Sequence, residues 1–316
     1  MNKTIVLITI DTEFSTHKDD MGIVGRIGRE DYGVAKLAQM LSQYHMKATW
    51  FIDVYTNKKQ YLPQFVKICR ELKDKGHDLQ LHTHPNGLFD PKRGSMQDYS
   101  LDEQIEIIKR GKKIFAQWFG HEPIAHRAGD WGANHDTLKA LQINGIKADS
   151  SMFYGWGNCQ LNRAPLTQNA VVEYEHLLEV PASVLHCISL GMFSPFRLLS
   201  TDGNSFTETW AMLKKMQNYG IPVVTTVYHS FSFVKWNSDR TQYHVDYNRI
   251  KKFDRFLKAL NQDPTIQVMT IKELYELYGG HVRGELSLRN KDFIPQSGLG
   301  ATALRLMERI SAGGNL

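Results

Sequence analysis

Cysteine is scarce in this 316-residue chain, and its three copies stand far apart, at positions 69, 159 and 187. This spacing contains none of the close cysteine pairs that form a disulfide framework or a thiolate zinc site. We therefore expect no disulfide scaffold. Unpaired cysteines of this kind suit a reducing compartment.

Long hydrophobic runs are absent as well. The first apolar stretch extends from Ile5 to Ile10 and ends at the acid Asp11, which is too short and too abruptly charged for a signal peptide. No other stretch approaches the length that a membrane-spanning helix needs. We therefore expect a cytoplasmic protein with no integral membrane segment.

The chain also lacks a large excess of one charge. It has 38 Lys and Arg against 33 Asp and Glu, a formal net charge of +5. The basic residues are scattered, and their adjacent pairs are typical of solvated helix faces, so nucleic acid is not an expected partner. Hydrophobic residues at 42% and charged residues at 22% fit a globular protein and exclude collagen, a disordered tail and a coiled coil.

What the sequence does contain is a regular alternation of predicted strands and helices. Apolar, β-branched runs predict the strands, and residues with helical spacing follow most of them. The predicted strands are 5–10, 48–54, 78–82, 123–126, 146–150, 171–181, 223–228 and 266–269, and the predicted helices are 32–44, 62–75, 101–119, 134–144, 206–219, 247–261 and 271–278. This order predicts an α/β fold with a parallel sheet, either closed into a barrel or open and doubly wound. We expect residues 1–280 to form this domain and 281–316 to form a tail that is helical, over 301–310, or partly disordered.

Polar side chains gather where the predicted strands end, which is where α/β folds place their chemistry. The first strand ends in Asp11, Thr12 and Glu13, and the third ends in His82 and His84. The spacing of the two histidines puts both imidazoles on one side of an extended segment. Such a set suits zinc or a similar divalent ion. A helix cap or a salt bridge is the alternative for the carboxylates, and a pair of histidines alone is more often incidental.

Later strands end in polar residues too. Arg127 follows the fourth strand and, if buried, needs a carboxylate partner such as Asp11. Asp149 ends the fifth strand, and His229 ends the strand predicted over 223–228. A lone histidine is usually structural, but polar residues at so many strand ends indicate one shared site.

Six short motifs, in this order, resemble those of the polysaccharide deacetylase family, also called the NodB-homology family or carbohydrate esterase family 4. The motifs are TIDTE (9–13), GHDLQLHTHP (76–85), HRAGDWG (126–132), ADSS (148–151), LLEVPAS (177–183) and VYHS (227–230). The resemblance implies a distorted (β/α)7 barrel. It also implies metal-dependent removal of an N-acetyl group from a carbohydrate, such as a glycan precursor, a lipid-linked sugar or a nucleotide sugar.

The resemblance implies a catalytic role for four residues. Asp11 takes the position of the general base, and Arg127 orients it. His229 takes the position of the acid that protonates the leaving amine. Asp149, from the fourth motif, is the remaining catalytic candidate.

The implied metal site departs from the usual family pattern. The first motif lacks its second Asp, and Asn86 stands where the second motif usually has its second His. Glu13 and His84 are the available substitutes beside His82. The resemblance therefore implies one divalent ion, expected to be zinc, that Glu13, His82 and His84 hold. Two alternatives stay open: Asp11 could be the metal carboxylate instead of Glu13, and Asn86 could be a ligand instead of His84.

Substrate contacts are expected from Asp130, Trp131 and Trp156, which lie on predicted rim loops, although each Trp fits core packing nearly as well. Two other functions remain open. One is hydrolysis of a non-sugar amide, as in relatives that share this barrel. The other is an inactive carbohydrate-binding relative, which Thr12 and Asn86 favour because neither replaces the usual ligand well.

Overall fold

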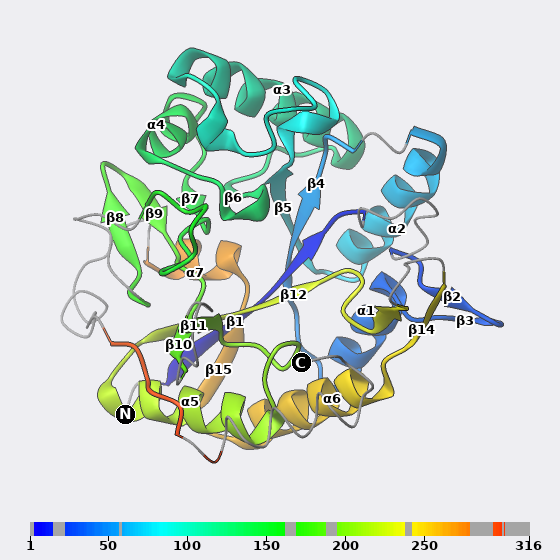
Figure 1. Cartoon of the computed structure of the whole chain (residues 1–316), viewed down its shortest axis with the longest axis vertical. Helices are drawn as coiled ribbons and strands as arrows, with labels where there is room; N and C mark the ends of the chain where they lie inside the picture. Colours follow the sequence, from blue (N-terminus) through cyan, green and yellow to red (C-terminus); the bar gives the residue numbers. More distant parts are fainter. Residues whose placement is uncertain are drawn as a thin grey trace.

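One curved sheet, mostly parallel, is wrapped by helices on its outer face (Figure 1). A computed structural model describes residues 3–14, 23–56, 59–161, 169–187, 195–237, 242–278, 293–298 and 300. Its main sheet has the strand order β12-β1-β4-β5-β6-β7-β9-β8, and β15 also pairs with β1. These strands are β1 (Thr4–Thr12), β4 (Thr49–Asp53), β5 (Asp78–Thr83), β6 (Ala125–Ala128), β7 (Ala148–Asp149), β8 (Val172–Tyr174), β9 (Leu177–Glu179), β12 (Val223–His229) and β15 (Ile266–Met269).

Helices follow most of the parallel strands, as the β-then-α order predicts. They are α1 (Val34–Gln43), α2 (Leu62–Asp74), α3 (Leu101–Phe119), α4 (His135–Ile143), α5 (Phe206–Tyr219), α6 (Tyr247–Gln262) and α7 (Ile271–Tyr278). The longest, α3, begins at a capping box made by Ser100 and Glu103 and ends at Gly120, which has the left-handed φ of 74° that favours glycine. Local chemistry therefore sets both ends of this helix.

Alternate residues of β1 explain how the inside of the sheet is filled. All nine residues of the strand are buried. Ile5 and Leu7 belong to an inner cluster that also contains Ile271 and Leu274 of α7, so this helix covers the sheet at the end where β1 begins. Successive side chains of a strand point to opposite faces, so the same inward column continues through Thr9 to Asp11. Apolar packing thus gives way to polar groups toward the carboxyl end of the strand.

The sheet curls into an incomplete barrel, which answers the choice between a barrel and an open doubly wound sheet. Its edge strands β8 and β12 are not paired with each other in the described strand order. Ser183 spans the gap beside β12: its N–H donates to the Thr225 carbonyl at 3.0 Å, and its hydroxyl accepts from the Thr225 N–H at 2.9 Å. The architecture is the distorted (β/α)7 barrel type that the sequence motifs implied.

The prediction of one strand over 171–181 is wrong. This segment forms the antiparallel hairpin β8–β9, with its turn at Glu175 and His176. Both turn residues have positive φ, 44° and 73°, although neither is glycine. The prediction missed the turn because neither of its residues is a glycine or a proline, the usual turn signals.

Three further hairpins lie outside the main sheet and were not predicted. They are β2 (Arg26–Ile27) with β3 (Glu30–Asp31), β10 (Val184–His186) with β11 (Phe196–Leu198), and β13 (Val234–Trp236) with β14 (Tyr243–Val245). Each of their strands has only two or three residues, too few to give a periodic pattern.

The predicted tail, 281–316, falls outside the described residues except for 293–298 and 300. Within that short segment the Ser297 N–H donates to the His186 carbonyl at 2.8 Å, so it lies beside β10. The predicted helix over 301–310 and the domain boundary at 280 stay predictions. No described helix is long and apolar enough to cross a membrane.

Candidate metal and catalytic site

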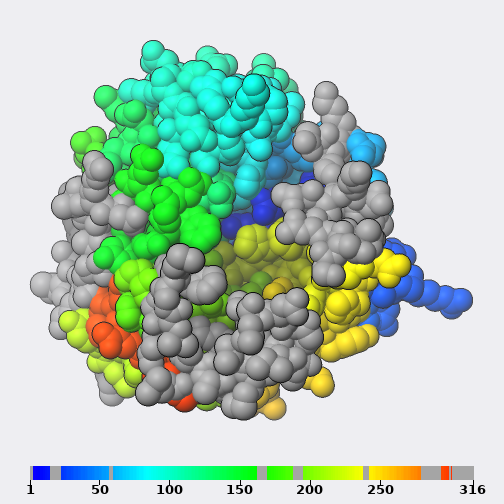
Figure 2. All heavy atoms as spheres, viewed as in Figure 1, coloured from blue at the N-terminus to red at the C-terminus, as the bar shows by residue number. Residues whose placement is uncertain are grey.

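Strand register brings the predicted site residues to one end of the sheet. Asp11 pairs with His229 across β1 and β12, and His82 pairs with Arg127 across β5 and β6. His82 also pairs with Asp53, the last residue of β4. Because these pairs all lie where parallel strands end, residues far apart in the chain share one region of the fold. Figure 2 shows N-terminal residues, in dark blue, at the centre of one face, between the cyan and green segments and the yellow segment.

Glu13, His82 and His84 form a cluster with the composition of a metal site. One ligand atom from each residue lies within 4.8 Å of the others. The carboxylate oxygen Oε2 of Glu13 is 3.6 Å from Nε2 of His82 and also contacts Nε2 of His84. Asn86, the alternative to His84, is exposed in the turn Pro85–Gly87 that follows. One carboxylate and two imidazoles match the donor set expected for zinc.

The hydrogen bonding of His82 leaves its Nε2 suited to metal binding. Nδ1 lies 2.8 Å from the carbonyl oxygen of Arg127. A carbonyl only accepts, so Nδ1 carries the hydrogen, and in the neutral ring Nε2 presents a lone pair toward Glu13. A backbone or carboxylate acceptor on the far nitrogen is the usual support of a metal-ligating histidine.

The electrostatics of the cluster show how strongly its members interact. Burial raises the pKa of Glu13, but His84 and His82 outweigh it and hold that pKa well below its usual range. Burial lowers the pKa of His84, but the carboxylates of Glu13, Asp53 and Asp11 raise it to about 9. The cluster therefore holds a proton between acid and imidazole at neutral pH, at the place where a cation is expected.

Main-chain contacts fix the segments that carry the cluster. The hydroxyl of Ser230 donates to the Glu13 carbonyl at 2.9 Å, and the Ser230 N–H donates to the Asp11 carbonyl at 2.9 Å. Gly129 lies against the His84 ring, where an added Cβ would come within 2.5 Å of ring atoms. Glycine at this position lets the backbone approach the imidazole closely, and any larger residue would displace the ring.

Arg127 is fully buried and held by four hydrogen bonds. Its Nη1 donates to Oδ1 of Asp11 at 2.7 Å, and Nη2 donates to Thr9 Oγ1 at 2.9 Å and Ser150 Oγ at 2.8 Å. Its Nε donates to the Ser150 carbonyl at 3.0 Å, and the guanidinium lies 4.3 Å over the ring of Phe51. The expected pairing of Arg127 with Asp11 is present, and it holds the carboxylate in a defined orientation.

His229 lies at the other side of the cluster. Its Nε2 is 3.9 Å from Oε1 of Glu13, and its ring stacks on Phe231 with centroids 5.1 Å apart. The Ser232 hydroxyl accepts from the His229 N–H at 2.9 Å and contacts the carboxylate of Asp202. About a third of the His229 side chain is exposed, so the ring remains reachable by a substrate.

Asp149 lies behind the cluster, in a buried network. Its Oδ1 accepts from Nδ1 of His126 at 2.8 Å, and Thr83 Oγ1 donates to Nε2 of the same ring at 2.9 Å. Glu179 pairs in register with Asp149 across β7 and β9, and burial followed by the Asp149 charge raises the Glu179 pKa well above its usual range. Asp149 also precedes Ser150, which binds Arg127.

The predicted substrate residues differ in their access to solvent. Trp156 is 39% exposed and stacks on Phe153, with centroids 5.5 Å apart and ring planes 4° apart. Its indole N–H donates to the carbonyl of Asp130, which is exposed. Trp131 is only 7% exposed and packs against Arg127 and Phe153. Trp156 and Asp130 thus offer surface to a ligand, and Trp131 offers little.

The backbone at Asp130 and Trp131 is unusual, because both residues have positive φ, 50° and 58°. Two successive non-glycine residues in this region are strained, and such strain clusters at functional sites. The side chain of Asn158 holds the segment by donating to Oδ2 of Asp130 at 3.0 Å and to the Ser95 hydroxyl at 2.9 Å.

Sequence reasoning missed Asp53, His126 and Glu179 as members of this region. Asp53 has the same signal as the residues that were found, since it is an acid at the end of an apolar strand. His126 ends the strand predicted over 123–126 and has the same signal, and its hydrogen bonds connect it to Thr83 and Asp149. Glu179 has no such signal, because it is a single polar residue within an apolar segment, and its register with Asp149 places it near the site.

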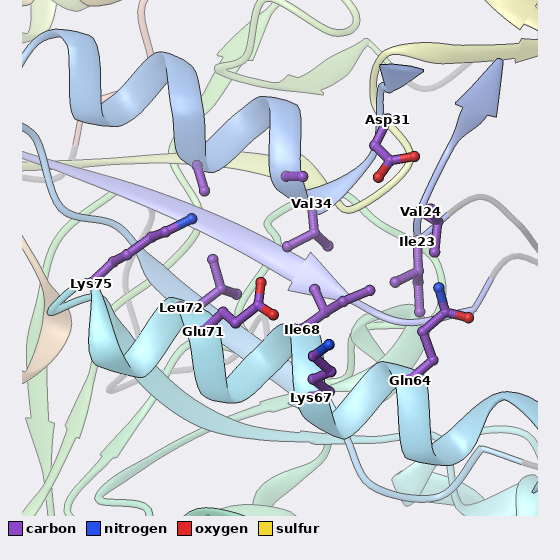
Figure 3. Close-up of a pocket in the computed structure, with 12 residues that line it drawn as sticks. Ile23, Val24, Asp31, Val34, Gln64, Lys67, Ile68, Glu71, Leu72 and Lys75 are labelled. Atoms are coloured by element: carbon purple, nitrogen blue, oxygen red, sulfur yellow. The ribbon is translucent and has the colours of Figure 1, made fainter. Parts of the chain in front are cut away.

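A separate cleft lies between α1 and α2 (Figure 3). Its walls are formed by residues such as Val34, Ile68 and Leu72, with Lys67 and Glu71 beside them. None of the predicted site residues lines it.

The comparison with known families agrees with the motifs. The family model of the polysaccharide deacetylases matches residues 19–148. This match covers less than half of the chain, so it shows a resemblance to these deacetylases over that segment. No curated protein sequence matches the chain.

Solved structures share the fold of this chain, and two of them have a TM-score above 0.5. A Mycobacterium smegmatis protein assigned as a polysaccharide deacetylase has 15% identity and a TM-score of 0.58, covering 95% of this chain and 96% of its own. A 4-α-glucanotransferase from Thermococcus litoralis has 12% identity and a TM-score of 0.52, covering 87% of this chain and 40% of its own. At these identities the likeness establishes the fold alone.

Proposed function

We propose that this chain is a metal-dependent hydrolase that removes an N-acetyl group from a carbohydrate. The observation that carries the proposal is the Glu13–His82–His84 cluster beside Asp11, which Arg127 holds. The match of residues 19–148 to the polysaccharide deacetylase model supports hydrolysis of an acetyl amide.

The donor set fits a divalent ion, and zinc is the ion we expect. Glu13 supplies an oxygen, and His82 and His84 supply nitrogens. The lone pair of His82 Nε2 and the Glu13 carboxylate face each other at 3.6 Å, an arrangement that a cation between them stabilises. Such an ion supplies polarisation of the acetyl carbonyl and a lowered pKa for water.

The other roles belong to residues on neighbouring strands. Asp11 takes a proton from the attacking water, and Arg127 keeps the Asp11 carboxylate oriented for this step. His229, paired with Asp11 across β1 and β12, gives a proton to the leaving amine. Asp149 does not contact the guanidinium of Arg127 directly. It supports the site through its neighbour Ser150, whose hydroxyl accepts from Nη2 of Arg127.

The sugar is expected to bind over the rim formed by Asp130 and Trp156. An exposed indole backed by the parallel ring of Phe153 gives a flat apolar surface on which a sugar ring can stack. The charges of His84 and Glu13 both act on the pKa of Asp130, so this rim adjoins the cluster. Trp131 contributes mainly by packing against Arg127.

A cytoplasmic location stays a prediction. Its support is the wide spacing of the three cysteines in the sequence, which suits a reducing compartment.

The test measures metal content and acetate release on the same purified protein. We expect about one zinc per chain and acetate release from at least one member of a panel of N-acetylated sugars, lipid-linked sugars and nucleotide sugars. His82→Ala should lose most of the metal and the activity together. Formate or ammonia from a non-sugar amide would instead identify an amidohydrolase, and a protein without metal or turnover would be an inactive relative.

A further inference from the structure

A third carboxylate, Asp53, lies beside the Glu13–His82–His84 cluster without belonging to it. It is the last residue of β4, it pairs in register with His82, and its side chain is 4% exposed. Its oxygens are outside the group of ligand atoms that lie within 4.8 Å of one another. Asp53 therefore adjoins the cluster without completing it.

Two main-chain groups bind one oxygen of Asp53. Oδ1 accepts from the Tyr55 N–H at 3.0 Å and from the His84 N–H at 3.3 Å. The second bond connects β4 to the residue that carries one of the cluster imidazoles. Asp53 thus restrains the backbone from which the His84 ring projects.

No ion pair with a lysine or arginine involves Asp53 among the described residues. The charged groups that act on it are His84, His82, and Glu13. The only positive charge near Asp53 among these groups is therefore that of the imidazoles, and a metal-bound imidazole is neutral. With the metal bound, this buried carboxylate would have the dication as its compensating charge.

Charge counting supports the same conclusion. The Asp11 carboxylate is already neutralised by Arg127. Glu13 alone brings one negative charge to a divalent ion, because neutral imidazoles bring none. Asp53 supplies the second negative charge in a low-dielectric region, where it acts strongly on a nearby dication.

Asp78, the buried acid at the other end of the β4–β5 strand pair, has hydrogen-bond donors around its carboxylate instead of imidazoles. It begins β5, 8% exposed, and its carboxylate accepts from the Thr49 hydroxyl, the Gln80 amide and the Lys272 N–H, at 2.9, 2.6 and 3.2 Å. These donors surround both oxygens. Hydrogen bonds therefore stabilise the Asp78 carboxylate without a metal ion, and Asp78 serves as a matched control.

We propose that Asp53 is a positioning residue of the metal site: its carboxylate restrains the His84 backbone and provides the second negative charge that a bound dication requires. This rests on the proposed function, because the dication is the one assigned there to Glu13, His82 and His84. Removing such a supporting group usually weakens metal binding by about 10–100-fold.

The experiment titrates Zn²⁺ into chelator-stripped full-length protein by calorimetry and measures the unfolding midpoint with and without Zn²⁺. Asp53→Asn keeps the size of the side chain and one acceptor oxygen but removes the charge. We expect its zinc affinity to fall by about 10–100-fold, with the stabilisation by zinc reduced to match. The metal-free variant should unfold no earlier than the wild type, because a buried charge has been removed.

Asp78→Asn provides the control, and its zinc affinity should equal that of the wild type even if its stability falls. Zinc binding by Asp53→Asn as tight as by the wild type would overturn the role of Asp53. An equal loss of affinity in Asp78→Asn would overturn it too, because any buried aspartate would then have the same effect. If the wild type and His82→Ala both fail to bind zinc, the proposed metal site itself is wrong.

Discussion

The two ends of the β4–β5 strand pair treat buried polar groups in opposite ways. At the amino end, Asp78 is surrounded by donors, and the side-chain oxygen Oε1 of Gln80 accepts from the N–H groups of Ile124 and Ala125 at 2.9 and 2.7 Å. At the carboxyl end, the carboxylate of Glu13 faces Nε2 of His82. The acids and amides of one end are hydrogen bonded within the fold, whereas Glu13, His82 and His84 at the other end form the donor set of a metal site.

The difference separates stability from function within one scaffold. A buried polar group that has all its partners stabilises a fold, whereas acceptors that face one another cost free energy until a ligand joins them.

Changing Asp11 to Asn should have the largest effect, confined to the carboxyl end. The amide keeps the shape of the side chain but cannot take a proton, so acetate release should fall by about 10²–10⁴-fold. Zinc should stay bound, because Glu13 holds it, and Glu13→Gln should lose zinc. Steady-state rates with metal analysis of both variants check this. If Asp11→Asn loses the metal while Glu13→Gln is milder, the two roles are exchanged.

Changing Arg127 to Met should destabilise the fold strongly. The pair with Asp11 is almost fully buried, and removal of one partner from a buried pair costs about 3–5 kcal/mol, since it leaves an uncompensated charge. Urea unfolding of the metal-free protein measures this. The double variant with Asp11→Asn should recover part of the loss. A cost below about 1 kcal/mol would mean that solvent screens this pair.

Changing His77 to Gln should alter the acid stability of the amino end. His77 is 5% exposed, its Nδ1 accepts from the Ala48 N–H at 3.2 Å, and burial, with Lys47 and Lys75, lowers its pKa to about 4. Its contribution to stability is present above the unfolded pKa of about 6.5 and is lost as pH falls toward 4.

The wild type should therefore lose about 3 kcal/mol more than His77→Gln between pH 7 and pH 4. Unfolding free energies of the metal-free proteins across this range give the difference, in which other titrating groups cancel. Parallel curves for the two proteins would show that His77 does not titrate with folding. Zinc affinity at pH 7 should be the same in both, because the residue precedes β5 at its amino end.

Changing Glu179 to Gln should have the smallest effect, and its sign should be opposite. The raised pKa of Glu179 means that its contribution to stability is present below its usual pKa and is lost as pH rises toward the folded value. The amide can still accept from the Met152 N–H, and it never ionises. The variant should therefore lose less stability than the wild type as the pH rises from 5 to 8. Thermal melts at both pH values test this, and a variant that loses more stability than the wild type over this range would contradict the raised pKa of Glu179.

Much of the fold was predictable because its signals are local. The bounds predicted for α3, α5, α7 and β15 agree with the structure to the residue. The capping residues of α3 and the glycines after α3 and α5 are read from neighbours in sequence. The hairpin at 175–176 was missed because its turn residues carry no such signal, and its positive φ values are imposed by pairing of β8 with β9.

The candidate site was predictable to the extent that strand ends are. Asp11, Glu13, His82 and His84 follow apolar strands, and parallel strands end at one edge of a sheet, so their meeting required no coordinates. Asp53 had the same signal but belonged to no motif. The pairing of Glu179 with Asp149 had no signal in sequence, because it depends on β7 and β9 lying side by side.

By itself, then, the sequence determined the order of strands and helices and the edge at which the polar groups gather, because the period of two and the capping residues act within a few residues. Only the tertiary structure decided which acid faces which cation. Asp11 pairs with Arg127, which lies 116 positions away in the chain, whereas Asp53 lies beside the imidazoles of His82 and His84. The reason is physical: the electrostatic free energy of a buried charge depends on the groups near it in space, and strand register determines which groups these are.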